Sequence, residues 1–188
     1  MDPSEFERRV EALAGGRVVR VRYHEIDYLN DDGRPLAVPA WNGSPDFDSL
    51  DYGLDLTMDD GAVFHVTWGT EFAQYGVTVQ TEPLHDVSAV RAWDVSASSR
   101  WATLVGKRIT SADVFWSWFE LADGSQRTEY PQDLRLTFED GSHVYLSACE
   151  VREGGFRTGM ADHITVFFGN EVAESHQVGP FAPNHRSA

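Results

Sequence analysis

The stretch Leu134-Arg-Leu-Thr-Phe-Glu-Asp-Gly141 decides the fold, because a close copy of it, Leu54-Asp-Leu-Thr-Met-Asp-Asp-Gly61, occurs earlier in the chain. In both stretches apolar residues alternate with polar ones, and each stretch ends at two acidic residues followed by glycine. This alternation is typical of a half-buried strand, and the acid-Gly ending is typical of a hairpin turn. The sequence therefore predicts two related β-hairpins.

The length of each turn follows from which residues must share a face. A two-residue turn would pair Leu56 with His65 and so place a core residue beside a polar one. A three-residue turn keeps one face of the hairpin apolar, and it requires glycine at positive φ at its last position. The pairs expected from it are Leu54–Val66, Leu56–Phe64, Leu134–Leu146 and Leu136–Val144. The opposite face then carries Asp55 beside His65 in the first copy and Arg135 beside Tyr145 in the second.

Three further blocks recur in the same order as the hairpins. They are Leu13 to Val18 with Leu104 to Ile109, Val77 to Val79 with Ile164 to Val166, and His85-x-Val87 with His176-x-Val178. We therefore expect an α+β, mainly antiparallel fold made by tandem duplication of a helix plus a four-to-five-strand meander. The two copies, residues 1–91 and 92–178, would form a pseudo-two-fold pair packed as one unit, followed by a disordered tail, residues 179–188.

Local signals place the first elements. Asp2 and Pro3 predict a helix over residues 3–14, and Gly15-Gly16 would end it. A strand is expected over residues 17–28, with Val19, Val21 and Tyr23 on one face and a bulge or strand end near Glu25. Residues 29–49 read as one long loop, of the kind that is often functional. Residues 94–105 are expected to form a second, weaker helix.

Composition narrows the function classes. Thirty acidic residues against fifteen basic ones give a formal net charge of −15, which repels nucleic acids and anionic membranes and attracts basic proteins, cations or cationic ligands. The alternative is that the acidity only keeps the protein soluble. The single cysteine, Cys149, excludes an internal disulfide and is expected to be structural. The sequence shows no signal peptide and no membrane-spanning run, so a cytoplasmic protein is expected. Lys107 is the one lysine among many arginines, a bias typical of GC-rich bacteria.

Acidic residues concentrate in one segment of the first copy. Between Asp27 and Asp60 there are nine acidic residues and one basic residue, Arg34. Acids beside aromatic residues suit docking to a basic protein, because aromatic side chains anchor and charges steer association. The residues expected to bind such a partner are Asp31, Asp32, Trp41, Asp46, Phe47 and Asp48. The alternative is a solvated loop with no partner.

A second candidate site is a small-molecule or catalytic pocket between the copies. Its expected residues are His24, Asp55, His65, Trp116 and Trp118, since Asp55 could orient an imidazole and the tryptophans could line a cavity. The alternatives are a surface Asp55–His65 pair and tryptophans buried in the core. No metal, phosphate-loop, nucleotide or nucleophile motif occurs, so we expect no metal, no cofactor and no catalytic residue.

The paired blocks, Leu13 to Val18 with Leu54 to Gly61 and Leu104 to Ile109 with Leu134 to Gly141, resemble small uncharacterised bacterial β-rich domains. These domains include immunity-type proteins linked to toxin systems. The shared residues build strands and turns, so the resemblance carries over no catalytic residue. It implies a non-enzymatic, acidic binding protein that masks a basic toxin surface. The oligomeric state does not follow from the sequence.

Overall fold

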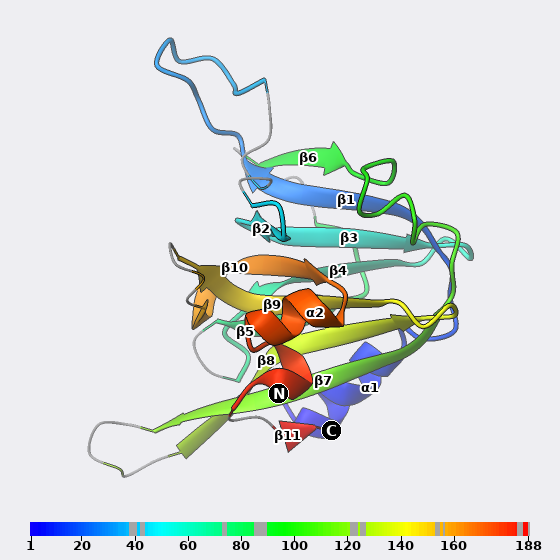
Figure 1. The fold of residues 1–188 in the computed structure, drawn as a ribbon, viewed down its shortest axis with the longest axis vertical. Helices are drawn as coiled ribbons and strands as arrows, with labels where there is room; N and C mark the ends of the chain where they lie inside the picture. The colour runs from blue at the N-terminus through cyan, green and yellow to red at the C-terminus, as the bar shows by residue number, and fades with distance from the viewer. Residues whose placement is uncertain are drawn as a thin grey trace.

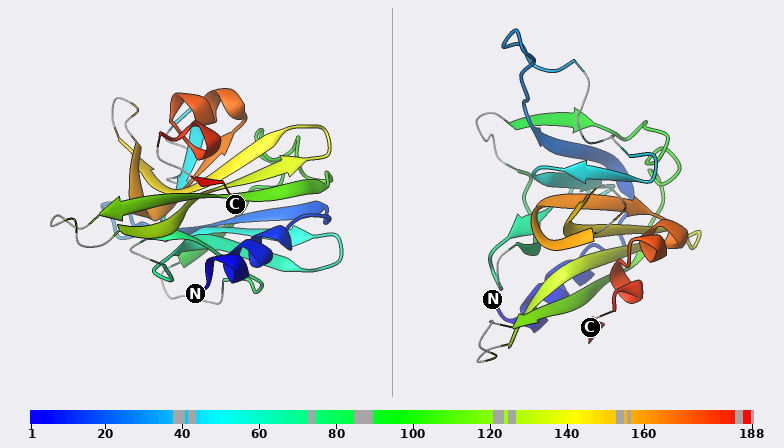
Figure 2. Two further views of the ribbon diagram at one scale, coloured as in Figure 1. Left: turned by 90° about the horizontal axis from the view of Figure 1, so that it is seen from below. Right: turned by 60° about the vertical axis from the view of Figure 1, so that its left-hand side comes forward.

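The structure, a computed structural model, describes residues 1–37, 41, 44–72, 75–84, 90–120, 124, 127–152, 155, 157–183 and 186–187. Within these ranges the fold is mainly antiparallel β, with two sheets packed face to face and few helices (Figures 1 and 2). No helix in them is long and apolar enough to span a membrane.

The first sheet has the strand order β5-β4-β3-β1-β6. Its strands are β1 (Val18–Ile26), β3 (Gly53–Met58), β4 (Val63–Gly69), β5 (Gly76–Gln80) and β6 (Val90–Asp94). The second sheet has the order β11-β7-β8-β9-β10-β2. Its strands are β2 (Phe47–Leu50), β7 (Ile109–Glu120), β8 (Arg127–Phe138), β9 (His143–Val151), β10 (Arg157–Phe168) and β11 (Arg186–Ser187).

The core lies between the sheets. Leu54 and Leu56 of the first sheet and Leu134 and Leu136 of the second are fully buried in one continuous apolar cluster. Helix α1 (Pro3–Glu11) packs against β5 and β7 and so bridges the two sheets. Its start follows the sequence prediction, because the Asp2 side chain accepts a hydrogen bond from the Ser4 amide.

Both hairpins have the predicted three-residue turn. In the first, Leu54 pairs with Val66 and Leu56 with Phe64; in the second, Leu134 pairs with Leu146 and Leu136 with Val144. The turn glycines Gly61 and Gly141 have φ of 90° and 81°. The alternation of apolar residues thus predicted register and turn type correctly, since a slip by one residue would expose the core face.

The two sheets contain the same run of four neighbouring strands. The order is β5-β4-β3-β1 in the first sheet and β10-β9-β8-β7 in the second. Where β1 and β7 begin, an antiparallel bridge joins Arg17 to Arg108, and backbone hydrogen bonds link the sheets reciprocally. They are Gly15 N to Ile109 O (2.8 Å), Gly106 N to Val18 O (2.7 Å), Ile109 N to Gly16 O (2.9 Å) and Val18 N to Lys107 O (3.1 Å).

Two strands connect the expected copies, residues 1–91 and 92–178. Strand β2 belongs to the first half of the chain but pairs with β10 of the second sheet, with Leu50 opposite Ile164. Strand β6 contains the boundary between the two copies and pairs along its whole length with β1. The expected loop over residues 29–49 therefore ends in a strand, and the two halves are tied together by more than their shared core.

The orientation predicted for Val19 is wrong. A register shift between Val18 and Arg20 lets Val18 enter the core and leaves Val19 45% exposed, while Val21 and Tyr23 are buried as predicted. The irregularity near Glu25 is the strand end at Ile26. Both Val18 and Val19 are apolar, so alternation alone could not choose between them.

Two further predictions are wrong. Residues 96–106 form hydrogen-bonded turns around the buried Trp101 and not a helix. The tail expected to be disordered forms a short 3₁₀ helix, η1 (Gly179–Phe181), and the strand β11, which pairs with β7. It follows α2 (Asn170–Ser175) and packs against the second sheet. The His85-x-Val87 block lies outside the described residues.

Candidate functional site

A narrow hairpin formed by residues 26–36, hereafter the finger, projects from the end of β1 beyond the first sheet (Figure 1). Asn30 organises it, because its side-chain oxygen accepts from the amides of Asp32 (3.0 Å) and Arg34 (2.9 Å). Leu36 N donates to Tyr28 O at 2.8 Å, and Gly33 turns the chain with φ of 72°. The finger is therefore an ordered, hydrogen-bonded hairpin.

The surface of the finger is both apolar and acidic. Of the five exposed large apolar side chains in the described part of the chain, three lie here: Ile26, Tyr28 and Leu29, the last 61% exposed. Asp31 and Asp32 are exposed at the turn. Monomeric proteins seldom leave such side chains exposed together without a binding role.

The six predicted partner-binding residues separate into two groups. Asp31, Asp32 and Asp46 are exposed, as docking requires. The other three side chains belong to the fold, which corrects the prediction for Trp41, Phe47 and Asp48. Trp41 packs on Tyr23 and Trp93, and Phe47 packs on Phe167 and His176. Asp48 is buried, where it pairs with Arg100 and accepts a hydrogen bond from Tyr23 Oη at 2.8 Å.

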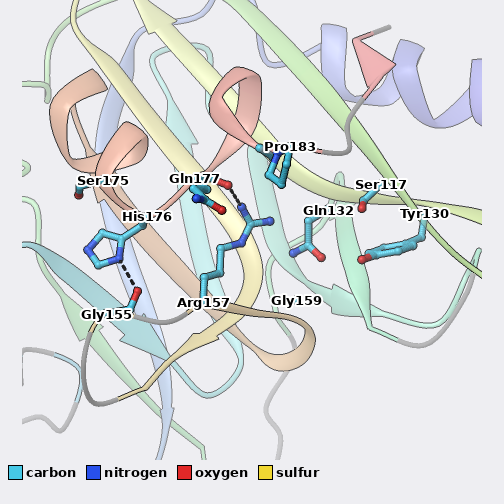
Figure 3. Close-up of a pocket in the computed structure, with 11 residues that line it drawn as sticks. Ser117, Tyr130, Gln132, Gly155, Arg157, Gly159, Ser175, His176, Gln177 and Pro183 are labelled. Carbon is cyan, nitrogen blue, oxygen red and sulfur yellow. Dashed lines mark hydrogen bonds between the residues drawn. The ribbon is translucent and has the colours of Figure 1, made fainter.

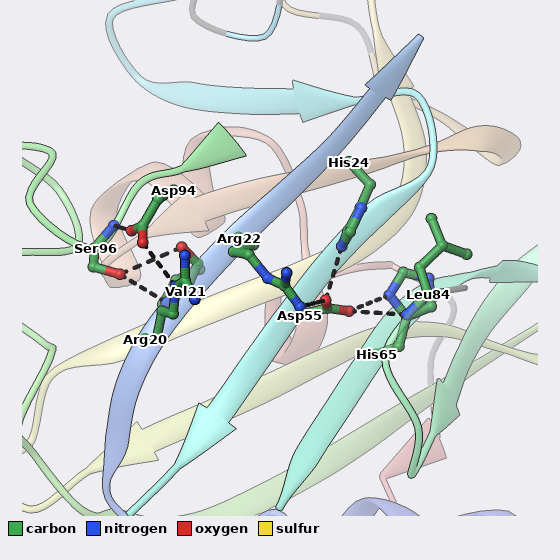
Figure 4. Close-up of polar contacts among 9 residues, drawn as sticks. All are labelled: Arg20, Val21, Arg22, His24, Asp55, His65, Leu84, Asp94 and Ser96. Atoms are coloured by element: carbon green, nitrogen blue, oxygen red, sulfur yellow. Dashed lines mark hydrogen bonds and ion pairs between the residues drawn. The ribbon is translucent and has the colours of Figure 1, made fainter. Parts of the chain in front are cut away.

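Asp55, His65 and His24 come together as the sequence suggested, on the face of the first sheet that points away from the core (Figure 4). We call these three residues the His–Asp–His cluster. His65 Nδ1 lies 2.8 Å from Asp55 Oδ1. His24 Nε2 lies 3.0 Å from Asp55 Oδ2, in a direction that makes no regular hydrogen bond. Contrary to the surface-pair alternative, all three are buried, with Asp55 and His65 fully inaccessible.

Arg22 and Leu84 complete the surroundings of Asp55. Arg22 Nη2 lies 2.9 Å from Asp55 Oδ2, and the amide of Leu84 donates to Oδ1 at 3.4 Å. Burial alone would raise the pKa of Asp55, but the contacts with His24 and His65 outweigh burial and hold that pKa far below its usual value. Asp55 is therefore an ionised carboxylate inside the protein.

Trp116 and Trp118 lie apart from the His–Asp–His cluster, so the structure does not bring the predicted pocket residues together. Trp116 is buried in the core, where its ring packs on Phe6 and Phe72 and its Nε1 donates to Glu7 at 3.0 Å. Trp118 stacks under the Arg127 guanidinium, 4.1 Å from the ring centre. Strand β7 is rich in aromatic residues because one of its faces packs against α1 and the core. Cys149 is buried, and burial raises the pKa of its thiol, as a structural role requires.

A pocket of about 540 Å³ does exist on the outer face of the second sheet (Figure 3). Its size suits a small ligand, and its central charged group is Arg157. That guanidinium, however, makes two hydrogen bonds to Asp133, at 2.9 and 3.1 Å, and one to the Gln177 carbonyl. Asp133 also accepts from the amide of Gly179 at 2.8 Å. The Asp133–Arg157 pair therefore holds the C-terminal segment on the sheet.

Sequence reasoning missed a pair of neighbouring carboxyl groups, Glu25 and Asp51. Burial, followed by the hydrogen bond and charge of Asp51, raises the pKa of Glu25 to about 9. Burial opposes the shift at Asp51, but contacts with His163, Glu25 and the Ile26 amide lower its pKa to about 2. Glu25 is thus a neutral acid hydrogen-bonded to Asp51, whose amide donates to Glu25 Oε1 at 3.3 Å. No local pattern signals this pair, because it depends on where β2 meets the end of β1.

Comparisons with known proteins found no matching family model, no matching curated protein and no matching solved structure. The function must therefore be inferred from the geometry of the chain.

Proposed function

We propose that the protein is a non-enzymatic binding module that docks, through the finger, on a basic protein surface. The observation that carries this proposal is the finger itself, a hydrogen-bonded projection with exposed Tyr28 and Leu29 beside Asp31 and Asp32. Apolar side chains on a preorganised support supply affinity with little loss of conformational entropy. The acids around them select a partner of opposite charge.

The charge of the whole chain supports the same choice of partner. A net charge of −15 speeds encounter with a cationic surface and disfavours an acidic one. The partner expected is a protein with lysine and arginine side chains around an apolar notch that accepts Leu29. In its narrower form, the proposal is an immunity-type inhibitor that masks a basic toxin. The acidic finger and the resemblance of the strand-and-turn blocks support that form.

The test is capture of the partner from cells of the source organism, followed by a binding measurement with the two purified proteins. Replacing Leu29→Ala should weaken binding by about 2 kcal/mol, as for a central anchor. The double variant Asp31→Asn/Asp32→Asn should slow association and reduce its salt dependence. The matched control is Glu171→Gln/Glu174→Gln on α2, which removes the same charge from exposed positions elsewhere.

A captured partner without a basic surface would contradict the proposal. So would affinity that is unchanged in both finger variants, or reduced equally by the control on α2. For the narrower form, co-expression of the captured protein should be toxic, and the wild-type chain should relieve that toxicity while Leu29→Ala relieves it less. If the captured partner is not toxic, docking through the finger would still stand, but the immunity role would be contradicted.

We also propose that the two halves are tandem copies related by a pseudo-two-fold axis. The shared strand order, the two identical turns and the reciprocal bonds around Arg17 and Arg108 support this. The test is an experimental structure in which the four strands β1, β3, β4 and β5 are superposed on β7, β8, β9 and β10. A rotation close to a half-turn is expected, and a rotation far from it would contradict the duplication.

A further inference from the structure

The His–Asp–His cluster brings two imidazoles and one carboxylate from three neighbouring strands into one small volume. One ligand-type atom from each of His24, Asp55 and His65 lies within 4.8 Å of the others. We propose that this cluster binds one divalent transition-metal ion of the Zn²⁺ class. The proposal concerns the outer face of the first sheet and is independent of docking through the finger.

The donor set selects the class of ion. Two imidazole nitrogens and one carboxylate oxygen suit Zn²⁺, Co²⁺ and Fe²⁺, whereas Ca²⁺ and Mg²⁺ require sets of oxygen atoms. Three protein ligands leave at least one coordination position for water or another group.

An unsatisfied nitrogen points to a missing ligand. His24 is 4% exposed, and its Nε2 faces Asp55 but has no hydrogen-bond partner among the described residues. Nε2 of the fully buried His65 has none either. Buried ring nitrogens are rarely left without a partner, because they lose hydration and gain nothing in exchange. A metal ion beside Asp55 Oδ2 would give the lone pair of His24 Nε2 a partner.

The second oxygen of the Asp55 carboxylate has its own partner. A carboxylate that binds a metal through one oxygen often has its second oxygen held by a neighbouring donor. Asp55 Oδ1 accepts a hydrogen bond from the amide of Leu84 at 3.4 Å. Arg22 Nη2 lies 2.9 Å from Oδ2, the oxygen that faces His24. The three side chains are buried, so an ion can reach them only through local opening of the structure.

The experiment uses the full chain, purified without a tag and freed of metal by dialysis against a chelator. Co²⁺ is titrated first, because its visible absorption reports the ligand geometry, and Zn²⁺ then displaces it. We expect one equivalent to bind. Binding should weaken by at least about 100-fold in His24→Ala and in His65→Ala. The control His163→Ala removes a histidine that contacts Asp51 and Asp162 instead, and it should leave binding unchanged.

A second measurement needs no variant and so does not depend on whether the variants fold. In wild-type protein, Zn²⁺ should shift the imidazole NMR signals of His24 and His65 and leave those of the other five histidines in place. Absence of stoichiometric binding would overturn the proposal. Binding that survives in both cluster variants, that is lost in His163→Ala, or that shifts other histidines would overturn it as well.

Discussion

The outer faces of the two hairpins place a charged side chain between two rings, but the sign of the charge is opposite. On the first face Asp55 lies between the imidazoles of His24 and His65. Its cross-strand partner on β1 is Arg22, at 2.9 Å. The carboxylate is fully buried, and the arginine is about one-third exposed.

On the second face Arg135 takes the corresponding place, with Tyr145 as its neighbour on β9. Its guanidinium lies 5.5 Å from the ring centre of Phe115, and its cross-strand partner on β7 is Asp113, at 3.1 Å. The Arg–Asp pair of the first face is thus reversed, and aromatic rings replace the two imidazoles.

The difference shows why only the first face needs histidines. A guanidinium can lie partly in water and over aromatic rings, and both Arg135 and Asp113 keep roughly a third of their side-chain surface exposed. A fully buried carboxylate has no contact with water, so it needs hydrogen-bond donors or positive charges inside the protein. The same backbone therefore carries a structural ion pair on one face and a ligand-like cluster on the other.

The largest expected effect comes from removing the central charge of each face. Asp55→Ala should destabilise the protein by roughly 3–5 kcal/mol, because it leaves Arg22 and the buried His65 without their acceptor and removes the charge that faces His24. Arg135→Ala should cost only about 0–1 kcal/mol from loss of its half-exposed pair. Urea unfolding of the metal-free proteins measures both values. Equal losses would mean that the two faces do not differ in the way described.

A second expected effect is a pH dependence that arises at Glu25, which follows His24 on β1. The pKa of Glu25 is raised from 4.5 to about 9, so its contribution to stability is complete below pH 4.5 and is lost as the pH rises toward 9. The slope of this loss approaches roughly 1.4 kcal/mol per pH unit. Glu25→Gln should remove it, as urea midpoints across that range will show. A variant that retains the slope would place the proton elsewhere.

A smaller effect tests what the halves share. Gly61→Ala and Gly141→Ala should each destabilise the protein by about 1 kcal/mol, because alanine is strained at φ of 90° and 81°. An added Cβ would meet nothing within 4 Å at either position, so the cost is purely conformational. Thermal unfolding should give two similar shifts. A shift in one variant alone would show that the two turns differ in conformation.

The smallest effect on stability is expected in the finger. Leu29→Ala removes an exposed side chain, so unfolding free energy should change by less than about 0.5 kcal/mol. A circular dichroism melt on the variant used for partner binding measures this. A large loss of stability would mean that Leu29 packs against the fold, and its effect on binding could not then be assigned to contact with a partner.

The sequence predicted the parts of the fold that depend on local alternation. The register of both hairpins and the pairing of Asp55 with His65 follow from the need for one apolar face. The sequence suggested that His24 lies near Asp55 and His65, because His24 is on the other face of its strand from Val21 and Tyr23. Its burial could not be predicted, because it depends on the pairing of β1 with β3 on one side and β6 on the other, where Gly53 and Ala92 lie opposite His24.

Parts that depend on distant contacts were missed. Strand β2 joins β10 through pairing across more than half the chain, and no residue of Phe47–Leu50 indicates that partner. The apolar pattern of residues 94–105 resembles that of a helix. Residues 96–106 instead form turns, with Trp101 buried and its Nε1 donating to Tyr23 Oη. The tail is held by Asp133 and Arg157, which lie far away in sequence.

The most direct test of the difference between the two faces is a crystal structure of the protein soaked with Zn²⁺, with diffraction data collected at the zinc absorption edge. We predict one anomalous peak bonded to His24, Asp55 and His65, and none beside Arg135 and Tyr145. An absence of density at the first face, with both histidines still turned toward Asp55, would contradict this prediction. So would a peak at the second face.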